Sequence, residues 1–283
     1  MLGDKQTQQV SQGSTAIQAG GNITILTTPA SEIEAICNLV FKANFPILRE
    51  EARLIAEENV QEFVSQLEER IEKVARNIEA EKFRDPDVQA CMNDAVQAAA
   101  RRGSASNQEI LCTLIVERVK TGNAEFKEIV LSEAVKIAPR LNAQQISALC
   151  TLLFGRYISR NNITSLSELR PMCSVALAAT NNHQILTNSQ LMHLSFLGVT
   201  TYINISPGDI YDHHNEYYPQ LGFTSGAVFK DRVYKEAPEY AILLERYNEN
   251  KLWCLTPTSV GLAIAVAAIS QYASDIDFDL WIN

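Results

Sequence analysis

The feature that most restricts the fold of this chain is a series of helix start and stop signals between residues 29 and 160. Ser31 and Glu34 have the spacing of a capping box, a motif in which each side chain satisfies a backbone amide at the start of a helix. Pro86 suits the first turn of a later helix, and Gly103 marks the end of that helix. We therefore predict a helical domain over 29–160 and a mainly α fold, a multi-helix array with short turns.

An apolar seam runs through the first part of this domain. Its members recur at alternating spacings of four and three residues, as on one face of a helix; they are Val60, Val64, Leu67, Ile71, Val74 and Ile78. We expect one helix to end near Asn44 and a long one to run from Pro46 to about Phe83. A seam of about two and a half heptads is shorter than a free coiled coil needs. We therefore predict that it packs in an antiparallel helix pair within the fold.

Residues 161–283 are less regular, and we predict a second helical domain there. Proline, glycine and aromatic residues over 206–237 indicate an irregular region with short helices. The strongly apolar stretch 257–272 predicts a buried helix, and residues 252–255 predict a short strand. Further helices are expected near 166–180, 188–203 and 237–247.

The last residues of the chain alternate between acidic and apolar types, which is the signature of a strand with one buried face. The acidic residues occupy positions 275, 277 and 279. The apolar face would hold Ile276, Phe278, Leu280 and Ile282. We therefore predict a short C-terminal strand.

Residues 1–28 form a polar segment rich in glycine and asparagine, and they hold the clearest strand pattern of the chain. A hairpin with a two-residue loop would mix polar and apolar residues on both faces. We prefer a three-residue loop over 19–21, because it places all three isoleucines on one face and a glycine in the left-handed position of the loop. A lone two-stranded hairpin is marginal in water, so this element requires a partner. The predicted assembly residues are Ile17, Gln18, Gly20, Gly21, Ile23 and Ile25.

Composition limits the classes of partner. The net charge of −9 repels nucleic-acid phosphates and argues against nucleic acid as a partner. The first residues lack the apolar run of a signal peptide, and the most apolar window, 260–269, is too short to span a bilayer. The six cysteines are scattered without a C-x-x-C pair, as in proteins of a reducing compartment. We expect a cytoplasmic protein that has no cofactor and does not bind membranes.

One polar cluster has the residue types of a metal site. Carboxylates and imidazoles of this kind bind divalent metals, so a metal-assisted enzyme is one interpretation. The spacing matches no zinc signature, and adjacent histidines point to different faces of any regular structure. A solvated polar loop is the interpretation that we favour. The residues are Asp209, Asp212, His213, His214 and Glu216.

Three segments of the chain have a recognisable form: Met1–Gln6, Gly13–Ile23, and a Leu-Thr-Pro pattern at 255–257 ahead of the last apolar helix. Together they resemble an uncharacterised bacterial family known by locus-tag names. That family is loosely similar to helical proteins of the abortive-infection type. The resemblance implies no catalytic residue.

Two shorter resemblances bear on function. Ile17–Gly20 is similar to the I-Q-x-G core of amyloid-type signalling motifs, and Lys251–Ala263 is similar to the strand-to-helix pattern of bacterial winged-helix proteins. We expect a non-enzymatic, self-associating protein of bacterial anti-phage immunity or signalling. Its terminal strands would pair between protomers, as a homo-oligomer, or onto another protein. The alternatives are a metal-assisted enzyme and a winged-helix-like nucleic-acid sensor.

Overall fold

The structure of the chain is a computed structural model, which describes residues 30–74, 80–121, 125–203, 208–273 and 278–282. Only the backbone is described for residues 30–48 and for Ala80. The chain divides into two compact units, residues 1–52 and 53–283. The predicted N-terminal hairpin lies outside the described residues, and so do its assembly residues Ile17, Gln18, Gly20, Gly21, Ile23 and Ile25.

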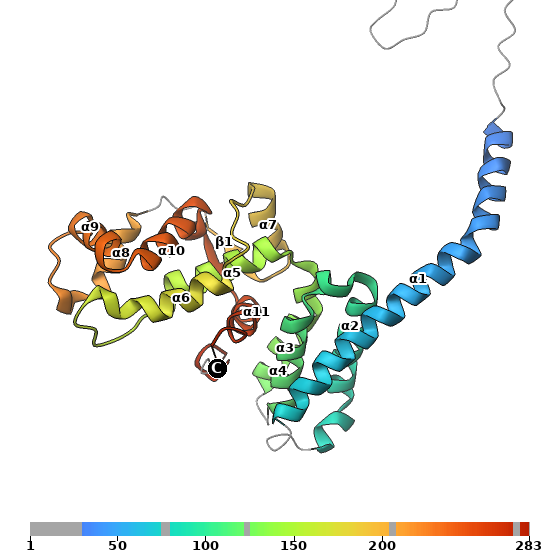
Figure 1. Cartoon of the computed structure of the whole chain (residues 1–283), viewed down its shortest axis with the longest axis horizontal. Helices are drawn as coiled ribbons and strands as arrows, with labels where there is room; N and C mark the ends of the chain where they lie inside the picture. Colours follow the sequence, from blue (N-terminus) through green and yellow to red (C-terminus); the bar gives the residue numbers. More distant parts are fainter. Residues whose placement is uncertain (1–29, 75–79, 122–124, 204–207, 274–277, 283) are drawn as a thin grey trace, which may run out of the picture. The chain divides into compact units, whose positions relative to one another are not determined.

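The described residues are mainly helical, which confirms the predicted fold class (Figure 1). The α-helices are α1 (Ala30–Val74), α2 (Pro86–Arg102), α3 (Gln108–Lys120), α4 (Glu125–Ile137), α5 (Ala143–Arg156), α6 (Arg170–Ala179), α7 (Asn188–Phe196), α8 (Ile210–Glu216), α9 (Gly226–Glu236), α10 (Pro238–Glu249) and α11 (Ser259–Ile269). The short 3-10 helices are η2 (Ala80–Arg84), η3 (Gly103–Ser106), η4 (Ala138–Arg140), η5 (Leu166–Leu169), η6 (Pro219–Leu221), η7 (Leu252–Cys254) and η8 (Phe278–Leu280). Two strands, β1 (Thr200–Tyr202) and β2 (Leu255–Pro257), pair antiparallel. None of the described helices is long and apolar enough to cross a bilayer.

The ends of α2 follow the local signals of the sequence. The Asp85 carboxylate accepts a hydrogen bond from the Asp87 amide at 2.8 Å and so caps the start of the helix. Gly103 ends the helix with a φ of +53°, in the left-handed region that favours glycine. The predicted limits of this helix are therefore confirmed.

Helix α1 differs from its prediction, because its backbone is helical without a break at Pro46. The two helices expected on either side of this proline are one helix. A proline inside a helix removes one backbone hydrogen bond, which interrupts the local pattern without ending the helix. The predicted helix start at Pro46 is therefore wrong.

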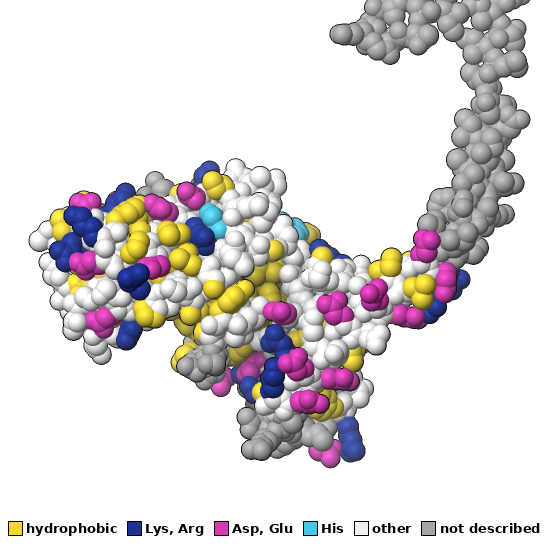
Figure 2. Space-filling view, viewed as in Figure 1, with side chains coloured by type: hydrophobic (Ala, Val, Ile, Leu, Met, Phe, Trp, Pro, Cys, Tyr) yellow, Lys and Arg dark blue, Asp and Glu magenta, His cyan; other side chains and the backbone are white. Residues whose placement is uncertain are grey.

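The part of α1 that belongs to the second unit packs against α2. Leu67 of the predicted seam is buried, together with Phe63. Asn59 Nδ2 donates to the Ala100 carbonyl near the end of α2, at 3.3 Å. Since the end of α1 leads into the start of α2, this contact makes the two helices antiparallel, as the seam predicted. Figure 2 shows acidic side chains along the outer face of this stretch.

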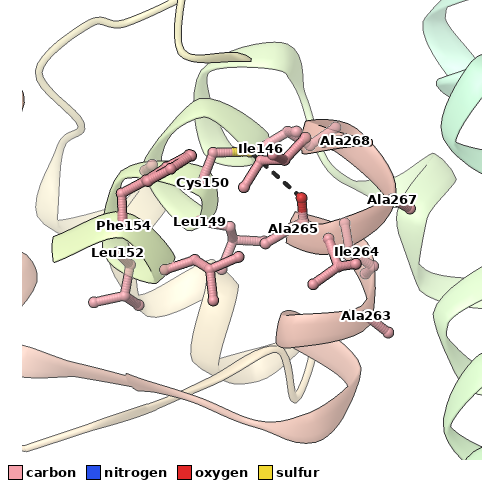
Figure 3. Packing of buried hydrophobic residues seen from close by; sticks show 14 of the residues in the cluster. Ile146, Leu149, Cys150, Leu152, Phe154, Ala263, Ile264, Ala265, Ala267 and Ala268 are labelled. Atoms are coloured by element: carbon pink, nitrogen blue, oxygen red, sulfur yellow. Dashed lines mark hydrogen bonds between the residues drawn. The ribbon is translucent and has the colours of Figure 1, made fainter. Parts of the chain in front are cut away.

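Helix α11 is the centre of the core. Apart from Ser259 at its start it carries no polar side chain, and it packs against α3, α4, α5 and α6. Figure 3 shows Ala268 of α11 beside Ile146 of α5, whereas Ala263 and Ala267 point away from α5; Cys150 Sγ lies 3.9 Å from the Ala265 carbonyl oxygen. The predicted buried helix is confirmed. The predicted domain boundary near residue 160 stays a prediction; α11 packs against helices from both sides of that point.

The two-stranded sheet was predicted only in part. Thr200 pairs with Pro257 and Tyr202 pairs with Leu255. The predicted helix over 188–203 ends at residue 196, because Gly198 adopts a φ of +72° and turns the chain into β1. The strand expected at 252–255 begins at its last residue, after the 3-10 turn η7.

The predicted C-terminal strand is wrong over the described residues 278–282, where the chain forms η8. Phe278 and Ile282 are buried as predicted, whereas Leu280 is 69% exposed. Residues four apart share a face in a helical turn as well as in a strand, so the apolar pattern fits both. Asp279 ties the turn to α4 through a 2.6 Å ion pair with the buried Lys127. Ile276 lies outside the described residues.

Candidate functional site

The polar cluster at 209–216 forms a short helix, α8, within the region expected to be irregular with short helices. The Asp209 carboxylate caps this helix and accepts a hydrogen bond from the Tyr211 amide at 2.8 Å. Asp212 reaches the next helix, where its Oδ1 accepts a hydrogen bond from the Gly226 amide at 2.7 Å. Both carboxylates therefore serve helix starts, the usual task of aspartate at such positions.

The two adjacent histidines of α8 lie in different environments. His213 is exposed, and its Nε2 lies 2.8 Å from the Tyr217 hydroxyl. His214 is buried, and its Nδ1 forms a hydrogen bond with the Tyr240 hydroxyl. Burial, and to a smaller extent the neighbouring His213, lower the pKa of the His214 imidazole to about 3. His214 is therefore a neutral core residue at physiological pH.

The structure does not gather the predicted metal ligands. In the part of the chain that is described, no three His, Cys, Asp or Glu side chains lie close enough together to hold a metal ion. Glu216 is exposed, and the other four residues take part in the separate contacts given above. Asp212, His213, His214 and Glu216 are close in sequence on a helix of seven residues. Adjacent positions on a helix point in different directions, so these side chains do not converge.

A second region, which the sequence analysis missed, presents large apolar side chains to solvent. Phe196 at the end of α7 is 77% exposed, and Met192 one turn earlier is 62% exposed. Tyr202 on β1 is 48% exposed. We call this region the α7–β1 surface, and its exposed apolar members are Ile185, Met192, Phe196, Tyr202 and Ile203.

The α7–β1 surface belongs to an uncharged stretch of the chain. No Asp, Glu, Lys or Arg occurs between Arg170 and Asp209. Figure 2 shows few charged side chains over α7, whereas acidic and basic side chains crowd the end formed by α8, α9 and α10. Depletion of charge together with exposed aromatic residues and methionine is typical of the centre of a protein interface. This absence of charge is the signal by which the sequence could have revealed the surface.

Strand β1 adds an open backbone edge to this surface. The Val199 carbonyl accepts from Thr258, and the Ile203 amide donates to the Cys254 carbonyl at 2.7 Å. Since alternate residues of an antiparallel strand bond to the same neighbour, the backbone of Tyr202 faces away from β2. Its amide and carbonyl have no backbone partner among the described residues. Tyr202 thus combines an exposed aromatic ring with unpaired strand-edge groups.

Comparison with known proteins assigns a family to the chain. A model of an uncharacterised protein family, named by a locus tag, matches residues 28–228 and 224–282. The chain belongs to this family. The match confirms the resemblance to a locus-tag family, whereas the likeness to abortive-infection proteins stays a prediction. The matched residues leave out the predicted hairpin. Comparisons with curated proteins and with solved structures gave no match.

Proposed function

We propose that this family member is a non-enzymatic interaction protein that assembles through its α7–β1 surface. The occupant that we propose is the uncharged segment Gly13–Ile25 of a second copy of the chain, for which the sequence predicts strands, added along the open edge of β1. The observation that carries the proposal is the set of exposed apolar side chains on α7 and β1, together with a Tyr202 backbone that has no backbone partner among the described residues. We expect this assembly in the bacterial cytoplasm, in immunity or signalling.

Charge and area favour this pairing. Residues 6–29 contain no charged side chain, and neither does the receiving stretch, so docking would desolvate no ion. Full burial of a large apolar side chain contributes about 1.5–3 kcal/mol. Phe196 and Met192 expose most of their area, so covering both would contribute roughly 2–4 kcal/mol. The segment in turn obtains the backbone and apolar partners that a lone hairpin lacks.

Light scattering on the purified full chain tests the proposal. The wild-type chain should have a molar mass of at least two chains, each of 31.4 kDa. Phe196→Asp places a charge in the centre of the docking surface and should return the mass to that of one chain, because an unpaired buried charge is costly. Ile242→Asp on α10 is the matched control, since Ile242 is also exposed but lies outside this surface. A wild-type chain that stays monomeric, or an unchanged mass for Phe196→Asp, would contradict the proposal.

A further inference from the structure

A cavity of about 520 Å³ lies among α5, α8, α10 and η7, apart from the α7–β1 surface. Aromatic side chains supply much of its wall: Tyr157, Tyr217, Tyr247 and Trp253. Arg156 and Asp209 give it two opposite charges. Pockets of this size, mostly aromatic with a few polar groups, are typical of small-molecule sites.

Arg156 brings a positive charge into this wall, and no described carboxylate forms an ion pair with it. Its guanidinium donates to the Tyr247 hydroxyl at 3.0 Å, to the Thr256 hydroxyl at 3.2 Å and to the Trp253 carbonyl at 3.0 Å. These described partners are all neutral. A guanidinium has five N–H groups, so three bonds hold it in place and leave others for a ligand. An anionic group would therefore find a fixed positive charge there whose described hydrogen-bond partners are neutral.

Neighbouring rings hold two of the aromatic walls in place. Tyr217 packs edge-on against His213, with ring centres 4.9 Å apart, and against His214 at 5.1 Å. Tyr157 packs edge-on against Trp281, with ring centres 6.3 Å apart. Both tyrosines remain partly exposed, at 38% and 40%. Rings that are fixed and still accessible offer faces on which a flat ligand can stack.

We propose that this cavity binds a nucleobase that carries a phosphate. The base stacks on the tyrosines, the phosphate pairs with Arg156, and the Asp209 carboxylate accepts hydrogen bonds from sugar hydroxyls or an exocyclic amine. The negative charge of Asp209 directs the phosphate to the Arg156 side. A free mononucleotide and a nucleotide at the end of a single strand share this chemistry.

Calorimetric titration of the full chain tests the proposal with defined probes. These are the four nucleoside 5′-monophosphates, adenosine, ribose 5-phosphate and a single-stranded hexanucleotide. At least one monophosphate should bind, and adenosine should bind about tenfold more weakly than its monophosphate because it lacks the charge-assisted contact. Binding of the hexanucleotide alone would assign the site to single strands.

Variants locate the binding. Tyr157→Leu should raise the dissociation constant about fivefold or more, the loss expected for one stacking contact. Tyr272→Leu is the matched control, because Tyr272 is 44% exposed and does not line the cavity. Tyr157 is a surface residue, so its replacement should leave the fold intact. The proposal is overturned if no nucleotide or hexanucleotide binds at about millimolar concentration, the weak end of specific binding. Equal affinity of adenosine and its monophosphate, or unchanged binding by Tyr157→Leu, overturns it as well.

Discussion

Replacing Gly261 with alanine should destabilise the fold, although the same change stabilises most helices. Gly261 lies in the first turn of α11, next to Val199, the residue that precedes β1. A Cβ atom at this position would lie 1.9 Å from the Val199 carbonyl oxygen and 2.9 Å from the Val199 carbonyl carbon. The same oxygen accepts a hydrogen bond from the Thr258 amide at 3.0 Å. The glycine thus permits the contact that joins α11 to the sheet.

The magnitude follows from opposing terms. Alanine favours a helix interior over glycine by about 1 kcal/mol. A close carbon–oxygen contact needs about 3.3 Å, so the backbone of Val199 would have to move by more than about 1 Å. Overpacking of this kind costs about 1–3 kcal/mol, and loss of the bond from Thr258 adds about 0.5–1.5 kcal/mol. We therefore expect Gly261→Ala to lower the free energy of unfolding by about 2 kcal/mol.

Equilibrium unfolding in urea measures this free energy. Gly208→Ala is the matched control, because a Cβ there meets no atom within 4 Å, and its effect should stay within about 0.5 kcal/mol. If Gly261→Ala is as stable as the wild type or more stable, the close packing of α11 against Val199 is refuted.

Two further predictions concern buried titratable groups. His214 has a pKa of about 3 in the folded chain and about 6.5 when unfolded, so its stabilising effect is complete above pH 6.5 and is lost as the pH falls toward 3. The free energy of unfolding should drop by about 2 kcal/mol from pH 6.5 to pH 5 through this residue, and His214→Gln should remove that part; equal pH slopes would contradict the assignment. Burial raises the pKa of the Cys150 thiol to about 12 and that of Cys91 to about 11. A thiol reagent such as Ellman's should therefore modify the buried cysteines only after unfolding, and rapid reaction of more than one of the six thiols of the native chain would disprove their burial; the buried ones are Cys91, Cys112, Cys150, Cys173 and Cys254.

Local signals predicted the helices well where one residue decides the boundary. The Asp85 carboxylate caps the start of α2 through the nearby Asp87 amide, and the Gly103 amide closes the end of α2 on the Ala99 carbonyl. The all-apolar α11 could be assigned as buried, because a helix without a polar face has no side to present to water. These elements depend on short-range chemistry, which is visible in sequence.

Elements that depend on distant contacts could not be predicted in the same way. Gly198 lies within a stretch that the sequence pattern predicts as helix. The turn there depends on the pairing of β1 with β2, which is far along the chain. The C-terminal turn is held by Lys127 of α4, and no local pattern distinguishes it from a strand.

The candidate sites show the same limit. The sequence identified the residue types of α8 but not their neighbours, because Tyr240 and Gly226 come from later helices. The cavity at Arg156 depends on η7 and α10, about a hundred residues further along the chain. Contacts between distant elements therefore decide which polar groups form hydrogen bonds within the fold and which face a ligand.

The most direct test of assembly is a cross-link from the predicted strand to its proposed partner. A photoreactive phenylalanine analogue replaces Ile23 in the full chain, and light- and heavy-nitrogen chains are mixed before irradiation. We predict mixed-label products in which position 23 is joined to a peptide that contains Phe196 or Tyr202. Cross-links confined to single chains, or joined between chains only to regions away from α7 and β1, would contradict strand addition at this surface.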